Sequence, residues 1–273
     1  MIIGKQTFDF TDNKAYIMGI LNITPDSFSD GGSHDTIATA LAHAQMMLDQ
    51  GCDIIDIGAE STRPGHTQIS TDEEIRRLVP ILEAIRDHFP NVAISVDCYR
   101  YETAEVALQH GADMINDIWG LTYDDKIAQV IAKYDGAACI MHNRPDRNYS
   151  DLLSDLLADT QHMLNIGLKA GIDPEKICID PGIGFAKDFT ENLITLKHID
   201  AFERFHLPIL LGTSRKGFLG QILDLPAPER DLGTAATTVY GYLHGARIFR
   251  VHDILANKQA LEVARQIVMS DHE

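Results

Sequence analysis

The sequence has no long apolar run and no export signal. None of its segments approaches the ~18 consecutive apolar residues of a membrane-spanning helix. The start, MIIGKQTFDF, lacks the basic region, the apolar core and the small-residue cleavage site of a secretory signal. We therefore expect a cytoplasmic protein without a membrane partner.

Cysteine is scarce, and basic residues are outnumbered. The four cysteines are widely spaced and form no Cys-x-x-Cys pair, so we expect buried, reduced thiols rather than a metal or redox motif. The chain has 40 acidic and 23 basic residues, and its net charge of -17 would repel the phosphate backbone of a nucleic acid. An anionic small substrate would then need a local concentration of Arg, Lys and backbone N–H groups.

Short aliphatic runs alternate along the chain with longer amphipathic stretches. This is the pattern of a parallel sheet wrapped in helices, and 273 residues is an ordinary length for one such barrel. It predicts an α/β fold, a single parallel (β/α)8 TIM barrel that forms one domain over residues 1–273. The eight expected strands are 16–22, 53–58, 92–97, 113–117, 137–142, 176–181, 207–213 and 246–252.

Amphipathic stretches between these strands predict the outer helices. They cover residues 35–50, 72–88, 101–110, 150–170, 190–205, 229–244 and 253–268. The expected N-terminal caps are Asp35, Thr71 and Asp253. Residues 2–10 alternate weakly, which predicts a short N-terminal β-hairpin that plugs the bottom of the barrel.

Each apolar run ends in polar residues. Parallel strands of a barrel end on one rim, where active sites of this fold are built, so these positions would form one polar mouth. A lone Asp or Asn commonly stops a strand or caps a helix, but so many coincident polar endings are hard to assign to capping alone. The endings are Asn22, Gly58 with Glu60, Asp97, Asn116 with Asp117, His142, Asp180, Thr213 with Ser214, and Arg250 with His252; Lys216 follows just beyond.

Two long loops follow the first two strands. The loop from Asn22 to Gly32 contains a Pro and a Gly pair, which favours a lid; a solvated loop is the alternative, and it would leave Phe28 exposed for no reason. The loop from Gly58 to Gly65 carries Arg63 beside a Pro-Gly turn. An Arg at this place suits an anion, and an ion pair with a surface carboxylate explains it equally well.

The last two strands supply further candidates for an anion site. Gly212–Gly217 leads into a helix, so backbone N–H groups would join Lys216, although neither GxxxxGK[ST] nor GxGxxG is present. Arg250 and His252 are two residues apart, which aims both into the barrel mouth. A satisfied core histidine is the ordinary alternative for His252, but it leaves the neighbouring Arg250 unexplained.

Asp97, Asn116 and Asp180 would bring two carboxylates and an amide together from different strands. One interpretation is a site for Mg²⁺ or Ca²⁺, which prefer oxygen ligands. The other is a heterocycle rich in N–H donors, whose edge fixed carboxylate and amide groups would recognise.

Successive motifs run in order along the whole predicted barrel. They are Asn22-Ile-Thr-Pro-Asp-Ser-Phe-Ser-Asp-Gly-Gly, Gly58-Ala-Glu-Ser-Thr-Arg-Pro-Gly, Ser95-Val-Asp, Ile115-Asn-Asp, Asp180-Pro-Gly-Ile-Gly-Phe, Gly212-Thr-Ser-Arg-Lys and Arg250-Val-His-Asp. The set resembles the signature motifs of the dihydropteroate synthases, a pterin-binding family. The resemblance implies a transferase of folate biosynthesis, the target of sulfonamides. It would condense 6-hydroxymethyl-7,8-dihydropterin pyrophosphate with p-aminobenzoate by an SN1-like displacement.

The resemblance also implies site residues, a metal and an oligomeric state. The pterin would contact Asp97, Asn116, Met141, Asp180, Phe185, Gly212 and Lys216. The pyrophosphate would contact Asn22, Arg63, Arg250 and His252, with Mg²⁺ at Asn22. The p-aminobenzoate would contact Phe28, Thr62, Pro64, Ser214 and Gly217. The residues implied in catalysis are Asp97, Lys216, Arg63, Arg250 and His252. The expected assembly is a homodimer through outer helices.

The chain departs from the family pattern at two places. Asn143-Arg-Pro-Asp follows His142 where many relatives have a Met-Gln-Gly-type continuation, and this loop receives no role here. Gly217 stands where many relatives have Ser, which removes a hydroxyl from the expected p-aminobenzoate site.

Two other functions are compatible with a pterin barrel. A pterin-dependent methyltransferase acting with a corrinoid protein would not require the Ser214–Lys216 turn or the full Thr62–Gly65 loop, so their presence counts against it. A noncatalytic pterin-binding paralogue would have lost loop residues, and none of the expected polar ones is missing.

Overall fold

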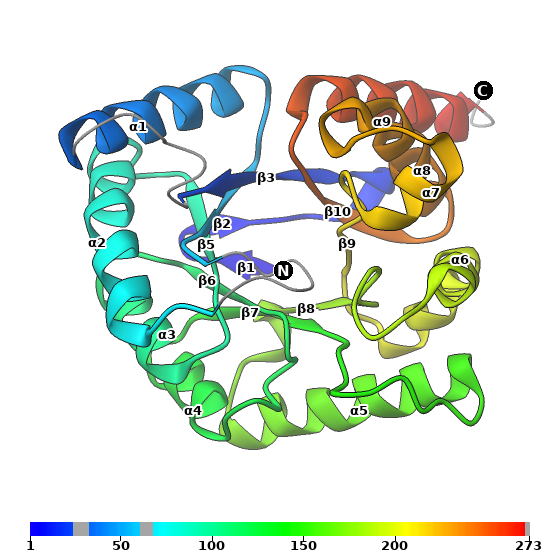
Figure 1. Cartoon of the computed structure of the whole chain (residues 1–273), viewed down its shortest axis with the longest axis horizontal. Helices are drawn as coiled ribbons and strands as arrows, with labels where there is room; N and C mark the ends of the chain where they lie inside the picture. The colour runs from blue at the N-terminus through cyan, green and yellow to red at the C-terminus, as the bar shows by residue number, and fades with distance from the viewer. Residues whose placement is uncertain (24–32, 61–67, 271–273) are drawn as a thin grey trace.

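The computed structural model describes residues 1–23, 33–60 and 68–270, and for residues 33–35 the backbone alone. Its centre is a closed barrel of parallel strands in the order β10-β3-β4-β5-β6-β7-β8-β9 (Figure 1). The strands are β3 (Tyr16–Asn22), β4 (Ile54–Gly58), β5 (Ala93–Asp97), β6 (Met114–Asp117), β7 (Ala137–Met141), β8 (Ile177–Asp180), β9 (Ile209–Leu211) and β10 (Ala246–Val251). The predicted (β/α)8 barrel is confirmed, and its strands lie within the expected ranges.

Helices surround the barrel on its outer side (Figure 1). They are α1 (Ser33–Asp49), α2 (Thr71–His88), α3 (Tyr101–Gln109), α4 (Lys126–Lys133), α5 (Leu152–Ala170), α6 (Phe189–Lys197), α7 (Gly217–Leu223), α8 (Asp231–Leu243) and α9 (Ile254–Met269). Short 3-10 helices are η1 (Thr11–Asn13), η3 (Pro174–Lys176), η4 (Ile199–Phe205) and η5 (Ala227–Glu229). Helix α4 was absent from the expected set, and the stretch 190–205 divides into α6 and η4.

The caps show where the sequence-based helix starts were right and wrong. Asp253 accepts a hydrogen bond from the N–H of Ala256 and caps α9 as expected. For α2 the prediction of Thr71 was wrong, because the Ser70 side chain accepts from the N–H of Glu73. Asp35 was also wrong as a start, since α1 begins at Ser33.

The N-terminal hairpin consists of β1 (Ile2–Ile3) and β2 (Gln6–Thr7), which pair antiparallel. Ile3 and the following Phe8 are buried against Met18, Ile54 and other side chains at the first inward-facing positions of the strands. The expected plug at the bottom of the barrel is therefore present.

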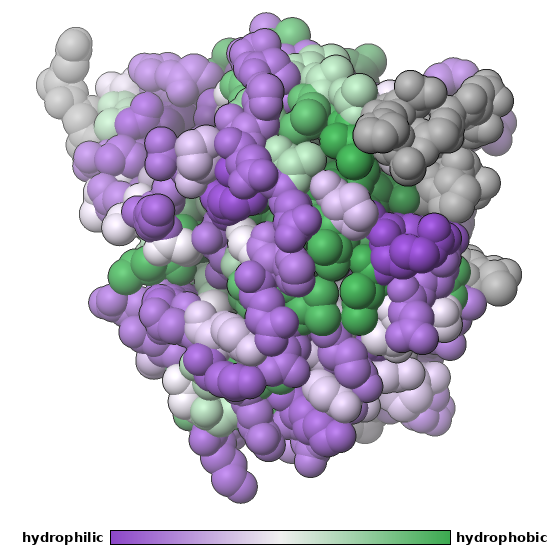
Figure 2. Space-filling model, turned by 90° about the vertical axis from the view of Figure 1, so that its left-hand side faces the viewer, coloured by the Kyte–Doolittle hydropathy of each residue, from purple (hydrophilic) through white to green (hydrophobic). Residues whose placement is uncertain are grey.

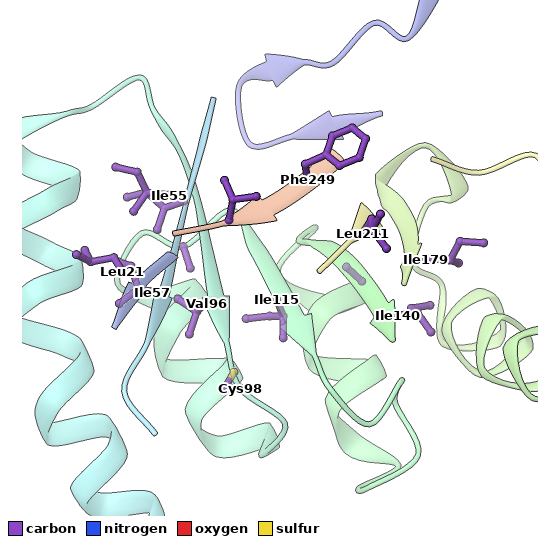
Figure 3. Packing of buried hydrophobic residues seen from close by; sticks show 14 of the residues in the cluster. Leu21, Ile55, Ile57, Val96, Cys98, Ile115, Ile140, Ile179, Leu211 and Phe249 are labelled. Carbon is purple, nitrogen blue, oxygen red and sulfur yellow. The ribbon is translucent and has the colours of Figure 1, made fainter. Parts of the chain in front are cut away.

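Side chains alternate between the two faces of each strand, as the period of a β-strand requires. Most of those on the outer face are aliphatic or aromatic and pack beneath the helices; the buried Asp117 of β6 is an exception. Figure 3 shows this shell around the barrel, with residues that include Leu21, Ile57, Val96, Ile115, Ile140, Ile179, Leu211 and Phe249. The inner face is apolar near the start of the strands and becomes polar toward the end of most of them; β7 stays apolar to Met141.

The outer surface of the helices is largely polar where α1 to α4 face the solvent. Figure 2 shows that hydrophilic residues dominate this side and that apolar residues gather in a narrower band. Within the described residues, no helix combines the length and apolar character that crossing a bilayer requires.

Candidate active site

Arg250 lies inside the barrel between two buried carboxylates. Its Nε donates to Asp56 Oδ2 at 2.6 Å, and its Nη2 donates to Asp97 Oδ2 at 2.8 Å. Asp56 is fully buried and Asp97 is 5% exposed, whereas the Arg250 side chain is 19% exposed. The guanidinium therefore neutralises two acids that would otherwise be costly to bury, and it lies on the side open to solvent.

The polar side chains beside Arg250 are not all satisfied. Asn116 Nδ2 donates to Asp56 Oδ2 at 3.4 Å. Among the described residues, three buried side-chain atoms have no hydrogen-bond partner: Asp56 Oδ1, Ser95 Oγ and Asp97 Oδ1. All three belong to inward-facing positions on β4 and β5. Unpaired buried polar atoms are rare in native proteins, and such a cluster of acceptors suits a ligand that carries N–H donors.

Gly212 leaves a space around which three charged residues meet. A Cβ atom at Gly212 would lie 3.5 Å from Asp180 Oδ2, 3.9 Å from Lys216 Nζ and 4.0 Å from Arg250 Cβ. Asp180 also accepts a hydrogen bond of 2.7 Å from the N–H of Gly182. The structure thus brings Asp180, Gly212, Lys216 and Arg250 together; the strand ends predicted this for Asp180 and Arg250, with Lys216 just beyond.

Lys216 lies above this space and beside an aromatic ring. Its Nζ donates to the carbonyl of Ile183 and lies 4.8 Å from the ring centre of Phe185. Burial lowers the pKa of Lys216 to about 8, although the Asp180 carboxylate opposes this shift. The ammonium is therefore held by few partners inside the protein, which leaves it able to bind a ligand.

Burial also changes the acids of the site. It raises the pKa of Asp97 to about 7, while Arg250 lowers it and Asp56 raises it further. It raises the pKa of Asp180 as well, with Lys216 opposing. A basic group of a ligand that pairs with either carboxylate would favour its charged form.

An apolar cluster lines the same region. Met141, Tyr99 and Ile118 are buried together, with Trp119 and Phe185 packed against them. The two expected pterin contacts in this set, Met141 and Phe185, therefore lie on one wall. A flat heterocycle needs such a wall for its faces and polar atoms for its edge.

Ser214 and His252 form a separate pair at the ends of β9 and β10. Ser214 Oγ lies 2.9 Å from His252 Nδ1 and accepts a hydrogen bond of 3.1 Å from the backbone N–H of His252. β10 ends at Val251, so His252 follows the strand, whereas Arg250 lies within it. Gly217 begins α7, and a Cβ there would meet no atom within 4 Å.

Asn22 lies at the end of β3, close to Asp97 at the end of β5. A Cβ on Gly58 would lie 3.5 Å from Asn22 Oδ1 and 3.8 Å from Asp97 Cβ. Among the described residues, no group of three or more His, Cys, Asp or Glu side chains is arranged to hold a metal ion. Asn22 can contribute one oxygen ligand, which fits a Mg²⁺ that takes most of its ligands from phosphate and water.

Four predicted site residues lie outside the described part of the chain. They are Phe28, Thr62, Arg63 and Pro64. Their assignments to the pyrophosphate and p-aminobenzoate stay predictions.

Sequence reasoning missed two residues of this region. Asp56 was passed over although an acid inside the apolar run Asp53–Gly58, at an inward-facing position, was a usable signal. Lys187 is 9% exposed and contacts the Gly182–Phe185 turn, but nothing in its sequence context distinguishes it from an exposed lysine.

Comparisons with known proteins identify the family. The family model described as pterin binding enzyme matches residues 18–252. A dihydropteroate synthase of Clostridium beijerinckii is 47% identical over 269 residues, which are 98% of this chain and 99% of that protein. One from Bacillus subtilis is 48% identical over 254 residues, 93% of this chain and 88% of that protein.

Solved structures give the same relationship. A dihydropteroate synthase of Clostridium difficile, solved in the presence of pteroic acid, has a TM-score of 0.92 and 43% identity, covering 96% of this chain and 99% of that one. One from Xanthomonas albilineans, solved with 4-aminobenzoic acid, has a TM-score of 0.89 and 34% identity, covering 94% of both chains. Full-length matches at this identity, together with a barrel that ends in buried acids, Lys216 and Arg250, show that the chain belongs to the pterin-binding enzyme family, as a transferase of the dihydropteroate synthase group.

Proposed function

We propose that this chain condenses 6-hydroxymethyl-7,8-dihydropterin pyrophosphate with p-aminobenzoate, releasing 7,8-dihydropteroate and pyrophosphate in folate biosynthesis. The observation that carries the proposal is the set of buried, unpartnered acceptors in the upper barrel, Asp56 Oδ1, Ser95 Oγ and Asp97 Oδ1. A dihydropterin presents several N–H donors along one edge, and these acceptors match them. Pteroic acid and 4-aminobenzoic acid, found with two relatives, have the corresponding chemistry.

The pterin would lie between Asp97, Asn116, Asp180 and Lys216, above Gly212 and against the wall of Met141 and Phe185. Polar atoms would bind its edge, and Gly212 would leave room for its ring. The charged groups here are fixed by the barrel strands, so little reorganisation is needed when charge develops during the reaction.

In the reaction, the bond between the pterin methylene carbon and the pyrophosphate oxygen breaks, and a bond to the amine nitrogen forms. The amine loses one proton, and the departing pyrophosphate is a suitable acceptor. A dihydropterin delocalises the developing cation, which favours an SN1-like path. Asp97 would stabilise that cation, while Arg250 and His252, with the predicted Arg63, would stabilise the leaving group.

Mg²⁺, when bound at Asn22 and the pyrophosphate, would supply further charge stabilisation of the leaving group. The amide oxygen of Asn22 lies on the same rim as Asp97, which supports this placement. The acceptor p-aminobenzoate would lie near Ser214 and Gly217, together with the predicted Phe28, Thr62 and Pro64.

We further propose a homodimer in the cytoplasm. Apolar side chains are exposed on two neighbouring helices, Ile222 and Leu223 on α7 and Leu232 and Leu243 on α8, with Leu232 85% exposed. A partner subunit would cover such a surface. The four free cysteines are all buried, which suits a reducing compartment.

The test is an assay of pyrophosphate release that requires both substrates. We expect release only when the pterin pyrophosphate and p-aminobenzoate are present together. A methyltransferase or a noncatalytic pterin-binding protein would release no pyrophosphate, and this result would overturn the proposal.

A further inference from the structure

The turn between β8 and α6, residues 181–188, carries part of the pterin site in an unusual conformation. Gly182, Gly184 and Ala186 have positive φ values of 71°, 87° and 47°, and for Ala186 this conformation is strained. A Cβ on Gly182 would lie 1.9 Å from the carbonyl oxygen of His142, so this turn approaches the loop after β7 very closely. Such a backbone needs external support to keep one shape.

Lys187 supplies that support from within the protein. Its Nζ donates to the carbonyls of Gly182 at 3.0 Å and Phe185 at 3.1 Å, and it lies 3.1 Å from His142 Nδ1. The lysine thus ties both ends of the Gly182–Phe185 segment to the end of β7. None of the roles proposed above for the reaction uses this buried amine.

The surrounding protons are consistent with a charged Lys187. Burial lowers the pKa of His142 to about 4, so its ring is neutral near pH 7. His142 Nε2 lies 3.0 Å from Asp159 Oδ2, which places the ring proton on Nε2 and leaves Nδ1 as an acceptor. Three acceptors around Lys187 match the three donors of an ammonium, although burial lowers its pKa to about 7.

The loop after β7 supports the same turn from outside. Tyr149 donates from its hydroxyl to the carbonyl of Ala186 at 2.9 Å. Arg144 donates to Asp159 at 2.5 Å and so holds the carboxylate that orients His142. The loop that departs from the family pattern therefore has a structural connection to the pterin wall.

The position of this turn determines where two groups of the proposed pterin site lie, the ring of Phe185 and the ammonium of Lys216. Phe185 packs against the Met141 wall, and the carbonyl of Ile183 accepts the hydrogen bond of Lys216. A shift of the turn would move the ring and release the ammonium together.

We propose that Lys187, held by His142, is a positioning residue for pterin binding, which fixes the Gly182–Phe185 segment so that Phe185 and Lys216 are set for the ligand. The proposal rests on the proposed function, because it assigns Lys187 a role in that same site. It gives a task to a buried charge that would otherwise only destabilise the fold.

The first test is Lys187→Met in the full chain, with Lys197→Met, an exposed lysine of α6, as the matched control. Binding of 6-hydroxymethyl-7,8-dihydropterin pyrophosphate is measured by calorimetry and by the fluorescence of Trp119, the single tryptophan, which packs on the same wall as Phe185. We expect Lys187→Met to bind about tenfold more weakly and with altered Trp119 emission, and Lys197→Met to be unchanged.

Ile85→Ala distinguishes a general loss of stability from a specific effect on pterin binding, because Ile85 is a buried residue of α2. This variant should have a lower melting temperature but an unchanged dissociation constant for the pterin pyrophosphate. If Ile85→Ala weakens binding as much as Lys187→Met does, a specific positioning role is wrong.

A milder variant covers the case in which Lys187→Met does not fold. Tyr149→Phe removes only the hydroxyl that bonds to Ala186. Tyr134→Phe is its control, since the Tyr134 hydroxyl bonds to Gln109 and Glu105, both on the outer helix α3. We expect Tyr149→Phe to weaken pterin binding roughly two- to fivefold and Tyr134→Phe to leave it unchanged. If the wild type binds tightly and Lys187→Met binds equally well, this inference alone is wrong. The same holds for equal binding by Tyr149→Phe if Lys187→Met does not fold. No binding by the wild type overturns it together with the proposed function.

Discussion

The lower and upper halves of the barrel interior have the same architecture and opposite chemistry. In the lower half, Met18, Ile54 and Leu210 pack with the N-terminal hairpin into a fully buried apolar layer. Two residues further along the strands, the inward positions hold Asp56, Ser95, Asn116, Gly212 and Arg250. The pleat places both sets on the same face, so the residue type alone decides which half stabilises and which half binds.

The upper half carries an energetic cost that the lower half does not. Burying Asp56 and Asp97 is tolerated because Arg250 pairs with both, yet one oxygen of each stays unpartnered. Sites that bind charged or polar ligands commonly keep such unfavourable groups. The apolar layer and the outer shell therefore stabilise a barrel whose mouth can keep polar groups for a ligand.

Arg250→Ala should have the largest effect on the polar upper half of the barrel. It removes the only described cation that pairs with Asp56 and Asp97, and it removes a proposed pyrophosphate ligand. We expect kcat/KM for the pyrophosphate substrate to fall by about 10²- to 10³-fold. Binding of the unphosphorylated pterin alcohol, measured by calorimetry, should fall far less. An equal loss for both ligands would mean that Arg250 only supports the fold.

Ile54→Ala is the control from the lower half, two residues before Asp56 on the same strand. It leaves a cavity in the apolar layer and should reduce the free energy of unfolding by about 2 to 5 kcal/mol. Its kcat/KM per folded molecule should match that of the wild type. If activity falls as it does for Arg250→Ala, the two halves are not functionally separate.

The same contrast explains which features the sequence could predict. Strand alternation and polar endings are local signals, so the barrel and the positions of Asp97, Asn116, Asp180 and Arg250 followed from them. Asp56 was missed because it lies in the middle of its strand and not at the end, although its inward register on β4 carries the same information. The capping of α2 by Ser70 instead of Thr71 is a one-residue error, which helix termini commonly produce.

Other features depend on contacts that no local pattern contains. Helix α4 is eight residues long, which is shorter than the ~11 to 18 residues over which apolar periodicity is read, so the prediction left it in a loop. Lys187 is buried only because the loop after β7 folds over it and supplies His142. The partners of Arg250 likewise come from strands 153 and 194 residues away in sequence. Tertiary packing, rather than propensity, determines these contacts.

Asp97 should make the free energy of unfolding depend on pH. Burial raises its pKa from 3.8 to about 7, so the folded chain holds this proton more tightly than the unfolded chain. Below pH 3.8 Asp97 is protonated in both the folded and the unfolded chain, so it does not change the free energy of unfolding. As the pH rises from there toward about 7, the unfolded chain loses the proton first, and the folded chain loses stability. Asn does not titrate, so the wild type should lose about 4 kcal/mol relative to Asp97→Asn across this window.

The measurement is denaturant unfolding of the wild type and Asp97→Asn at several pH values. Asp125→Asn, at an exposed position before α4, is the matched control and should run parallel to the wild type. A difference between the wild type and Asp97→Asn that stays constant with pH would show that the Asp97 carboxyl is not perturbed by its place in the upper barrel.

The smallest expected effect concerns space rather than charge, and compares Gly212→Ala with Gly217→Ala. At Gly212 an added methyl would lie 3.5 Å or more from its neighbours, an ordinary contact, so the variant should fold with an unchanged melting temperature. That methyl would occupy the region proposed for the pterin ring, and we expect pterin affinity to fall about tenfold, or ~1.4 kcal/mol. At Gly217 the methyl meets nothing within 4 Å and lies outside the pterin pocket, so pterin affinity should not change. Calorimetry on both variants decides. If Gly212→Ala binds the pterin as well as Gly217→Ala does, the ring does not lie over β9, and the upper layer binds its ligand elsewhere.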